Sequence, residues 1–97
     1  MTTPLTLTTT TDAHGRPVVK AAGEIDLSNT ATFAAALADT EGPLVVDLTE
    51  VLYIDSAGMS VLFTHAERTE LITSRLLTPI LEMSGLTSMA TVRHAEE

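Results

Sequence analysis

The feature that most constrains the fold of this chain is an apolar strand that runs directly into the start of a helix. Leu44 to Leu48 is rich in β-branched residues and bounded by turn signals, which is typical of a buried central strand, and the run continues loosely to Ile54. Asp55 and Ser56 then close the strand and open a helix with an apolar stripe. Ser56 is therefore expected where the first helical turn leaves backbone N–H groups without partners.

The flanking segments predict a mixed β-sheet covered by helices. β-branched runs predict strands, apolar spacings of three and four predict helices, and Gly, Pro and Asp clusters predict turns. The expected elements are a hairpin of 5–11 and 17–25, a helix through 31–38 after the N-cap candidates Asp26 and Ser28, the helix after Asp55, a brief strand at 70–73, a short helix from Pro79 to a Gly85 cap, and a strand near 89–92. This order predicts an α/β fold. Residues 1–97 are expected to form a single domain, with residues 94–97 frayed.

Charge and composition exclude several classes of function. The chain has 13 acidic and five basic residues and a net charge of -8, so it should bind neither nucleic acid nor a membrane. The absence of cysteine excludes disulfides, thiol chemistry and thiolate metal sites. No signal-peptide pattern and no run long enough for a membrane helix is present, so a cytoplasmic location is expected by default.

Catalytic arrangements are also poorly supported. The three histidines fall in a turn, a helix and a tail, with no spacing typical of a zinc site. A hydrolase triad of Ser56, His65 and Asp55 would need His65 beside Ser56, yet it lies more than two helical turns away at about 5.4 Å a turn. We therefore expect a protein that is not an enzyme and that holds no cofactor.

Two interpretations of Ser56 follow from its position. Its hydroxyl could simply cap the free N–H groups of the helix, because serine is a preferred N-cap residue. Alternatively, a phosphoserine at this place would be partly stabilised by the helix N-terminus and repelled by Asp55. Asp26 likewise has a simple interpretation as an N-cap.

Three motifs in sequence order resemble a known family. They are Gly23-Glu24-Ile25-Asp26 at a strand end, Asp55-Ser56-Ala57-Gly58-Met59 after the apolar strand, and Met83-Ser84-Gly85-Leu86 near the C-terminus. Together they resemble the STAS domain of bacterial anti-sigma-factor antagonists, the SpoIIAA-like group, over nearly the whole chain. The resemblance implies a mixed sheet of four or five strands with helices mainly on one face.

The resemblance also implies a function and a site. In that family an anti-sigma factor that is itself a serine kinase phosphorylates the serine matched by Ser56, and a protein phosphatase is the expected opposing partner. The unphosphorylated form binds the kinase and frees the sigma factor. The partner-binding residues that this implies here are Asp26, Asp55, Ser56, Ala57, Gly58 and Met59.

The chain departs from the family in two places. Ala57 stands where relatives often carry a hydroxyl, so Ser56 is left as the acceptor. The segment 65–80 looks shortened and lacks a glycine pair, which predicts a vestigial fourth strand and exposed apolar side chains at Leu71, Ile72, Leu76 and Leu77. Such a patch could support a homodimer. Glu67, Arg68 and Glu70 are expected to form a solvated face.

Other roles remain open at this point. A STAS module could serve in a stress scaffold or as an accessory subunit of a transporter. The helix N-terminus could also seat the phosphate of a small ligand or nucleotide.

Overall fold

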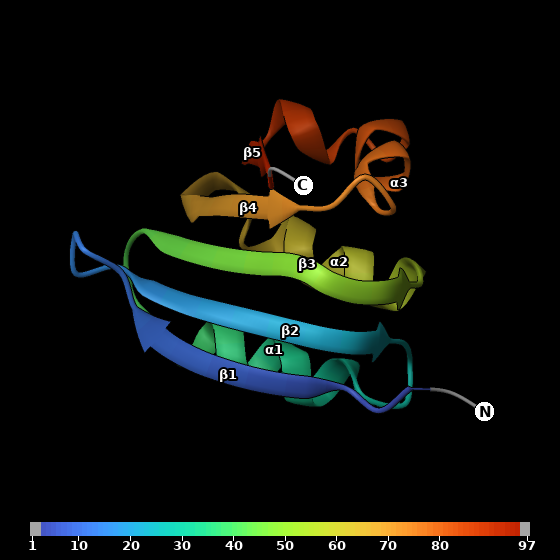
Figure 1. Cartoon of the computed structure of the whole chain (residues 1–97), viewed down its shortest axis with the longest axis horizontal. Helices are drawn as coiled ribbons and strands as arrows, with labels where there is room; N and C mark the ends of the chain where they lie inside the picture. Colours follow the sequence, from blue (N-terminus) through green and yellow to red (C-terminus); the bar gives the residue numbers. More distant parts are fainter. Residues whose placement is uncertain (1–2, 96–97) are drawn as a thin grey trace.

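The computed structural model describes residues 3–95, which form a five-stranded mixed sheet with three α-helices (Figure 1). The elements in chain order are β1 (Thr6–Thr11), β2 (Pro17–Ile25), α1 (Thr30–Ala38), β3 (Leu44–Ile54), α2 (Ser56–Thr64), the 3₁₀ turn η1 (Ala66–Arg68), β4 (Thr69–Thr73), α3 (Thr78–Met83), the 3₁₀ turn η2 (Leu86–Ser88) and β5 (Thr91–His94). The sheet order is β1-β2-β3-β4-β5, with β1 antiparallel to β2 and the other neighbours parallel. The predicted α/β fold is confirmed.

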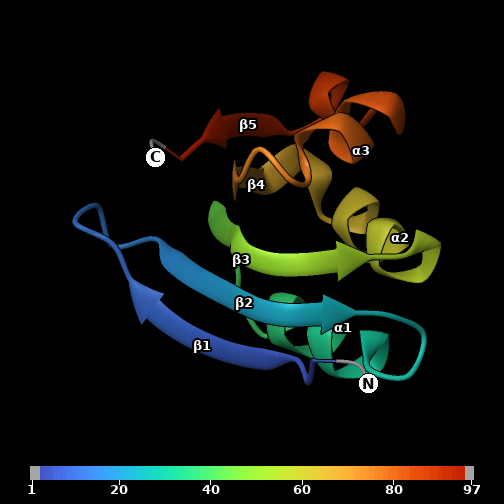
Figure 2. The ribbon, with the colours of Figure 1, turned by 45° about the vertical axis from the view of Figure 1, so that its right-hand side comes forward.

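The core lies between the sheet and the helices. α1 and α2 lie behind the sheet in both views of the ribbon (Figures 1 and 2). Val19, Ala21 and Ile25 alternate along β2 and are fully buried, because successive side chains of a strand point to opposite faces. Phe33 and Leu37 of α1 are equally buried. The prediction that helices lie mainly on one face is therefore confirmed.

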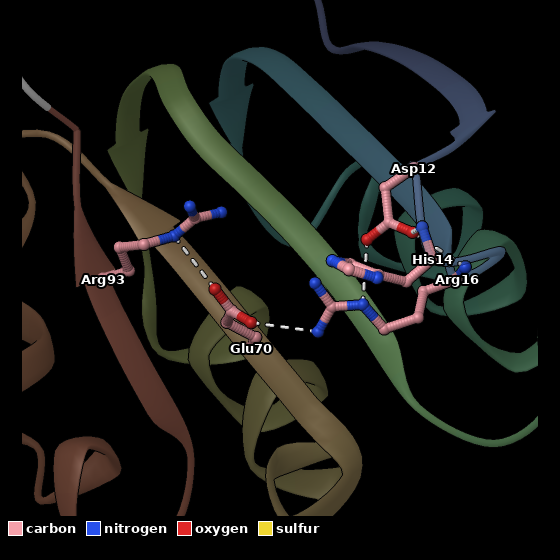
Figure 3. Close-up of polar contacts among 5 residues, drawn as sticks. All are labelled: Asp12, His14, Arg16, Glu70 and Arg93. Atoms are coloured by element: carbon pink, nitrogen blue, oxygen red, sulfur yellow. Dashed lines mark hydrogen bonds and ion pairs between the residues drawn. The ribbon is translucent and has the colours of Figure 1, made fainter.

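The face of the sheet away from α1 and α2 carries a chain of ion pairs (Figure 3). Arg16 contacts Asp12 at 2.8 Å and Glu70 at 3.0 Å, and Glu70 also contacts Arg93 at 2.9 Å. Hydrogen bonds to Glu70 and Asp12 raise the pKa of Arg16, and the backbone N–H of Arg16 lowers the pKa of Asp12. The prediction that Glu70 is solvated is wrong, because this side chain links two basic partners across the sheet.

Arg68 also differs from the solvated residue that was predicted. Its guanidinium donates hydrogen bonds to the carbonyl oxygens of Gly42 at 2.8 Å and Leu37 at 2.9 Å. These carbonyls lie at and beyond the end of α1, where backbone acceptors lack helical partners. Arg68 therefore ties the end of α1 to η1, whereas Glu67 is exposed as predicted.

The second half of the domain is more complete than its short sequence predicted. β4 has five residues and pairs with both β3 and β5, so it is not vestigial. Leu71 and Leu77, which were expected to be exposed, are each 1% exposed, and Ile72 is half-buried. The prediction is wrong for Leu71 and Leu77 because both join the main core cluster. Leu76 is 59% exposed, as expected.

The C-terminal end is partly ordered by β5. His94 is the last residue of this strand, and the N–H of Ala95 donates to the carbonyl of Thr73 at 2.9 Å. The prediction that His94 is frayed is therefore wrong, while residues 96–97 lie outside the described part of the chain. Between residues 3 and 95, no helix has the length and apolar character needed to cross a membrane.

Candidate functional site

The candidate site lies at the edge of the sheet where β2 and β3 end. Because these strands are parallel, their carboxyl ends lie side by side. β2 continues into the loop 26–29 that precedes α1, and β3 continues through Asp55 into α2. The N–H of Asp55 donates to the carbonyl of Ile25 at 3.1 Å, so the two segments are hydrogen-bonded at this edge.

Asp55 uses both carboxylate oxygens to organise the site. Its Oδ1 accepts the N–H of Gly58 at 3.0 Å, which caps the first turn of α2. Its Oδ2 accepts the N–H of Leu27 at 3.1 Å, which fixes the loop 26–29 against the start of the helix. The Asp55 side chain therefore links the two segments, in addition to the backbone hydrogen bond between Asp55 and Ile25.

The loop 26–29 is held by its own polar side chains. Oδ1 of Asp26 accepts hydrogen bonds from the N–H and the hydroxyl of Ser28. Asn29 accepts the N–H of Asp26 at 3.0 Å and donates to the carbonyl of Glu24 at 2.9 Å. The N-cap position of α1 is Asn29, so the prediction of Asp26 or Ser28 there is wrong. Local hydrogen bonds commit both side chains to the loop.

Ser56 is the first residue of α2, and its side chain is exposed. Asp55 caps the helix, so the interpretation of Ser56 as the capping residue is wrong. Within residues 3–95 the Ser56 hydroxyl has no hydrogen-bond partner, whereas the neighbouring hydroxyls are engaged. Ser28 donates to Asp26, and Ser60 donates to the carbonyl of Ser56 at 3.0 Å. The structure thus presents one serine hydroxyl here without an internal role.

The three residues after Ser56 differ in exposure. Ala57 is partly exposed, whereas Gly58 is buried and Met59 is only 8% exposed. A Cβ built at Gly58 would lie 2.6 Å from Cγ1 of Ile54 and 2.7 Å from Cγ2 of Ile25. Glycine therefore allows α2 to approach the ends of β2 and β3 closely. Gly58 and Met59 support the site from beneath.

Sequence reasoning missed one exposed apolar residue at the site. Leu27 is 80% exposed and lies in the loop that Asp55 holds. The signal that could have found it is its position, since it lies between the two polar N-cap candidates Asp26 and Ser28 and outside any apolar stripe.

His65 lies at the other end of α2 from Ser56, at the C-cap position. Its Nδ1 lies 3.2 Å from Nη2 of Arg68. Partial burial, and then the charge of Arg68, lower the pKa of His65. The structure does not bring together the hydrolase triad considered from the sequence.

A metal site is not supported by the described ranges either. In residues 3–95 no group of three or more His, Asp or Glu side chains is placed to hold a metal ion. The candidate site is therefore the exposed hydroxyl of Ser56 at the start of α2, beside the loop 26–29 that Asp55 holds.

Comparisons with known proteins agree with the observed fold. The family model described as "Mlab, STAS domain" matches residues 9–91. An anti-sigma factor antagonist from Mycobacterium paratuberculosis has a similar structure, with a TM-score of 0.78 and 23% sequence identity over 92% of this chain and 85% of that chain.

Two further solved structures share the fold at lower similarity. An antisigma-factor antagonist STAS domain from Rhodobacter sphaeroides matches with a TM-score of 0.52 and 16% identity over 94% of this chain and 85% of that chain. An uncharacterized protein with a SpoIIAA-like fold from Shewanella loihica matches with a TM-score of 0.56 and 14% identity over 98% of this chain and 88% of that chain. No curated protein is similar enough in sequence to count as a match.

Proposed function

Because this chain belongs to the STAS domain family, we propose that it is an anti-sigma-factor antagonist whose partner binding is switched by phosphorylation of Ser56. In this proposal the unphosphorylated form binds an anti-sigma serine kinase and so frees a sigma factor in the cytoplasm. The kinase modifies Ser56, the modified form is released, and a protein phosphatase restores it. The chain acts as a kinase substrate and a binding module, not as an enzyme.

The observation that carries the proposal is the exposed, unengaged hydroxyl of Ser56 at the start of α2. A kinase needs a hydroxyl that it can reach and that no internal hydrogen bond withholds. Ser28 and Ser60 are also exposed, but their hydroxyls donate to Asp26 and to the Ser56 carbonyl. Ser56 is therefore the best acceptor at this edge.

Electrostatics explain how modification would act on a partner. A phosphate adds about 1.5 to 2 negative charges at neutral pH. The helix N-terminus stabilises part of that charge, which favours a domain that stays folded. Asp55 already contributes a carboxylate beside the modified residue. A partner surface suited to a neutral hydroxyl would then face a strongly anionic site, and its affinity should fall.

The proposed contact surface combines the first turn of α2 with the loop 26–29. Ser56, Asp55 and Asp26 supply polar groups, and Ala57 and Leu27 supply partly or largely exposed apolar groups. Gly58 and Met59 contribute by holding this surface in place.

The test is phosphorylation by candidate serine kinases followed by site mapping. Incubation with ATP and each kinase from the same genome, analysed by mass spectrometry, should place the label on Ser56. Ser56→Ala should remove the label and keep kinase binding, and Ser56→Asp should weaken binding at least tenfold, or about 1.4 kcal/mol. Label at another residue, or equal affinities of the two variants, would refute the switch.

Ser60→Ala is the matched control. Ser60 lies one turn further along the exposed side of α2, and its hydroxyl is already engaged. This variant should be labelled and bound like the unmodified chain. If it abolishes labelling as Ser56→Ala does, the assignment of the acceptor is wrong.

The alternative role is that of a STAS accessory subunit in another assembly. The description of the matching family model names a STAS domain and does not mention anti-sigma antagonism, so the accessory role needs its own test. Affinity capture of native complexes distinguishes the two roles. A transporter ATPase among the partners, with no kinase, would favour the alternative.

A further inference from the structure

We infer that the outer edge of β1 is a self-association surface that pairs antiparallel with β1 of a second copy of this chain. β1 is the first strand in the sheet order, and among residues 3–95 its only neighbouring strand is β2. It forms the lower margin of the sheet in Figure 1. An edge strand presents a row of unpaired N–H and C=O groups that can continue the sheet.

The edge is open and regular. Five of the six residues of β1 are exposed. Its pairing with β2 runs one to one from Thr6 to Thr11, whereas the pairing of β2 with β3 contains register shifts. A regular six-residue strand gives a second strand a continuous ladder about 20 Å long.

The composition of β1 lacks the devices that usually block edge pairing. Five of its residues are threonine, and β-branched residues favour strands. Lysine, proline and bulges, which commonly protect an edge, do not occur between Thr6 and Thr11. The opposite edge strand, β5, has only four residues and carries Arg93 and His94.

Charge favours a second copy as the occupant of this edge. Two chains with a net charge of -8 repel each other over most of their surfaces. Residues 3–11 contain no charged side chain, and the first carboxylate after them, Asp12, is ion-paired with Arg16. Along this edge two copies can approach with the least repulsion.

Side-chain chemistry also favours a self-complementary partner over a foreign peptide. Strand addition gains sequence specificity from pockets that select alternate side chains. A uniform row of threonines offers no such pockets. In a dimer, a two-fold axis through β1 would place threonine opposite threonine, and this pairing does not depend on pockets. Leu5 and Leu7 pack at the margin of the core, and a neighbouring strand would cover them further.

The interface is expected to be weak. Edge pairing of six residues buries less than the roughly 800 Å² per partner of a stable interface. Wild-type protein should therefore shift from monomer to dimer in sedimentation equilibrium as its concentration rises through the micromolar range. A monomer at all concentrations up to millimolar would overturn the inference.

Paired glutamates should separate edge pairing from other contacts. Thr8 and Thr10 are exposed and lie opposite Lys20 and Val18 of β2, so Thr8→Glu with Thr10→Glu should leave the monomer folded and remove the dimer. Thr32→Glu with Ala35→Glu adds the same charge at exposed positions of α1 and should dimerise like the wild type. A dimer that survives the edge substitutions in a folded variant would overturn the inference.

A cross-link locates the interface independently. The chain contains no cysteine, so a single Thr8→Cys variant reports only on this edge. It should form a disulfide-linked dimer under oxidation, whereas Thr32→Cys should not. Edge amides that gain hydrogen-exchange protection only when a kinase partner is added would assign the edge to that partner and overturn self-association. Ser56 labelling of the Thr8→Glu/Thr10→Glu variant should be unchanged. If β1 self-association is refuted, the phosphorylation proposal is therefore unaffected.

Discussion

The two carboxylate oxygens of Asp55 accept hydrogen bonds from N–H groups of different segments, Gly58 in α2 and Leu27 in the loop 26–29. Replacing Asp55 by alanine removes both bonds, and we expect the free energy of unfolding to fall by about 1–2 kcal/mol in urea denaturation. Asp55→Asn should cost less, because its amide oxygen can keep one of the two bonds.

Asp39→Ala is the matched control for Asp55. Asp39 is exposed at the C-cap of α1, where a negative charge is disfavoured by the helix dipole. Its removal should leave the stability unchanged or slightly higher. Equal losses for the two aspartates would mean that Asp55 has no special capping role.

His65 gives the domain a predictable dependence on pH. Burial and Arg68 lower its pKa, so the unfolded chain binds a proton at a higher pH than the folded chain does. The contribution of neutral His65 to stability is complete above the unfolded pKa of about 6.5 and is lost as the pH falls below it. Urea denaturation at several pH values should show this decline.

His65→Asn tests the origin of that decline. The asparagine oxygen can accept from Arg68 in place of Nδ1, but it does not titrate. The variant should therefore lose less stability than the wild type between pH 7 and pH 5, because the unfolded histidine, with a pKa of about 6.5, takes up its proton in this range. Parallel stability curves would show that another group is responsible.

At the scale of elements, Gly58 decides how closely α2 packs on the sheet. An added Cβ would meet branched side-chain atoms of Ile54 and Ile25, which cannot rotate away easily. Gly58→Ala should therefore destabilise the domain by about 1–3 kcal/mol despite the higher helix propensity of alanine. Thermal or urea unfolding measures this loss.

Ser60→Ala serves as the comparison on the same helix. Ser60 is exposed, so its stability change should stay within about 0.5 kcal/mol. A Gly58→Ala variant as stable as Ser60→Ala would show that α2 can shift outward without loss. The site at its first turn would then be less rigidly placed than the contacts indicate.

The elements show where sequence reasoning succeeds and where it stops. The bounds of β2 and the continuation of β3 to Ile54 follow from local pattern, because β-branched runs and turn residues act over a few positions. Glu70 and Arg68 were misjudged because their partners Arg16 and Leu37 lie far away in the sequence. No local pattern contains such contacts.

The candidate site was predictable to the same degree. The strand-to-helix junction placed Ser56 at the start of α2 from sequence alone. Which of Asp55 and Ser56 caps α2 could not be predicted, since aspartate and serine are equally good N-cap residues. The exposed Leu27 was missed because apolar loop residues carry no periodic signal.

For the whole molecule, the proposed switch should change recognition and not folding. Ser56 is exposed at the first position of α2, where a negative group is favoured by the helix dipole. Ser56→Glu should therefore change the free energy of unfolding by no more than about 0.5 kcal/mol. Its NMR amide spectrum should differ from that of the wild type only near α2 and the loop 26–29. Global unfolding of this variant would contradict a surface switch.

The packing of the first described residues has a practical consequence for any assay of this protein. The N–H of Thr3 donates to the Glu24 carboxylate at 3.1 Å, and the Pro4 carbonyl lies against Gly23, which places this segment two residues from Asp26. An affinity tag or fluorescent fusion placed ahead of Thr3 would start beside the proposed contact surface and would obstruct it. Immobilisation tags and reporter fusions should instead follow β5, which lies two strands away from β3, so that a lost signal reports on recognition and not on crowding by the fusion.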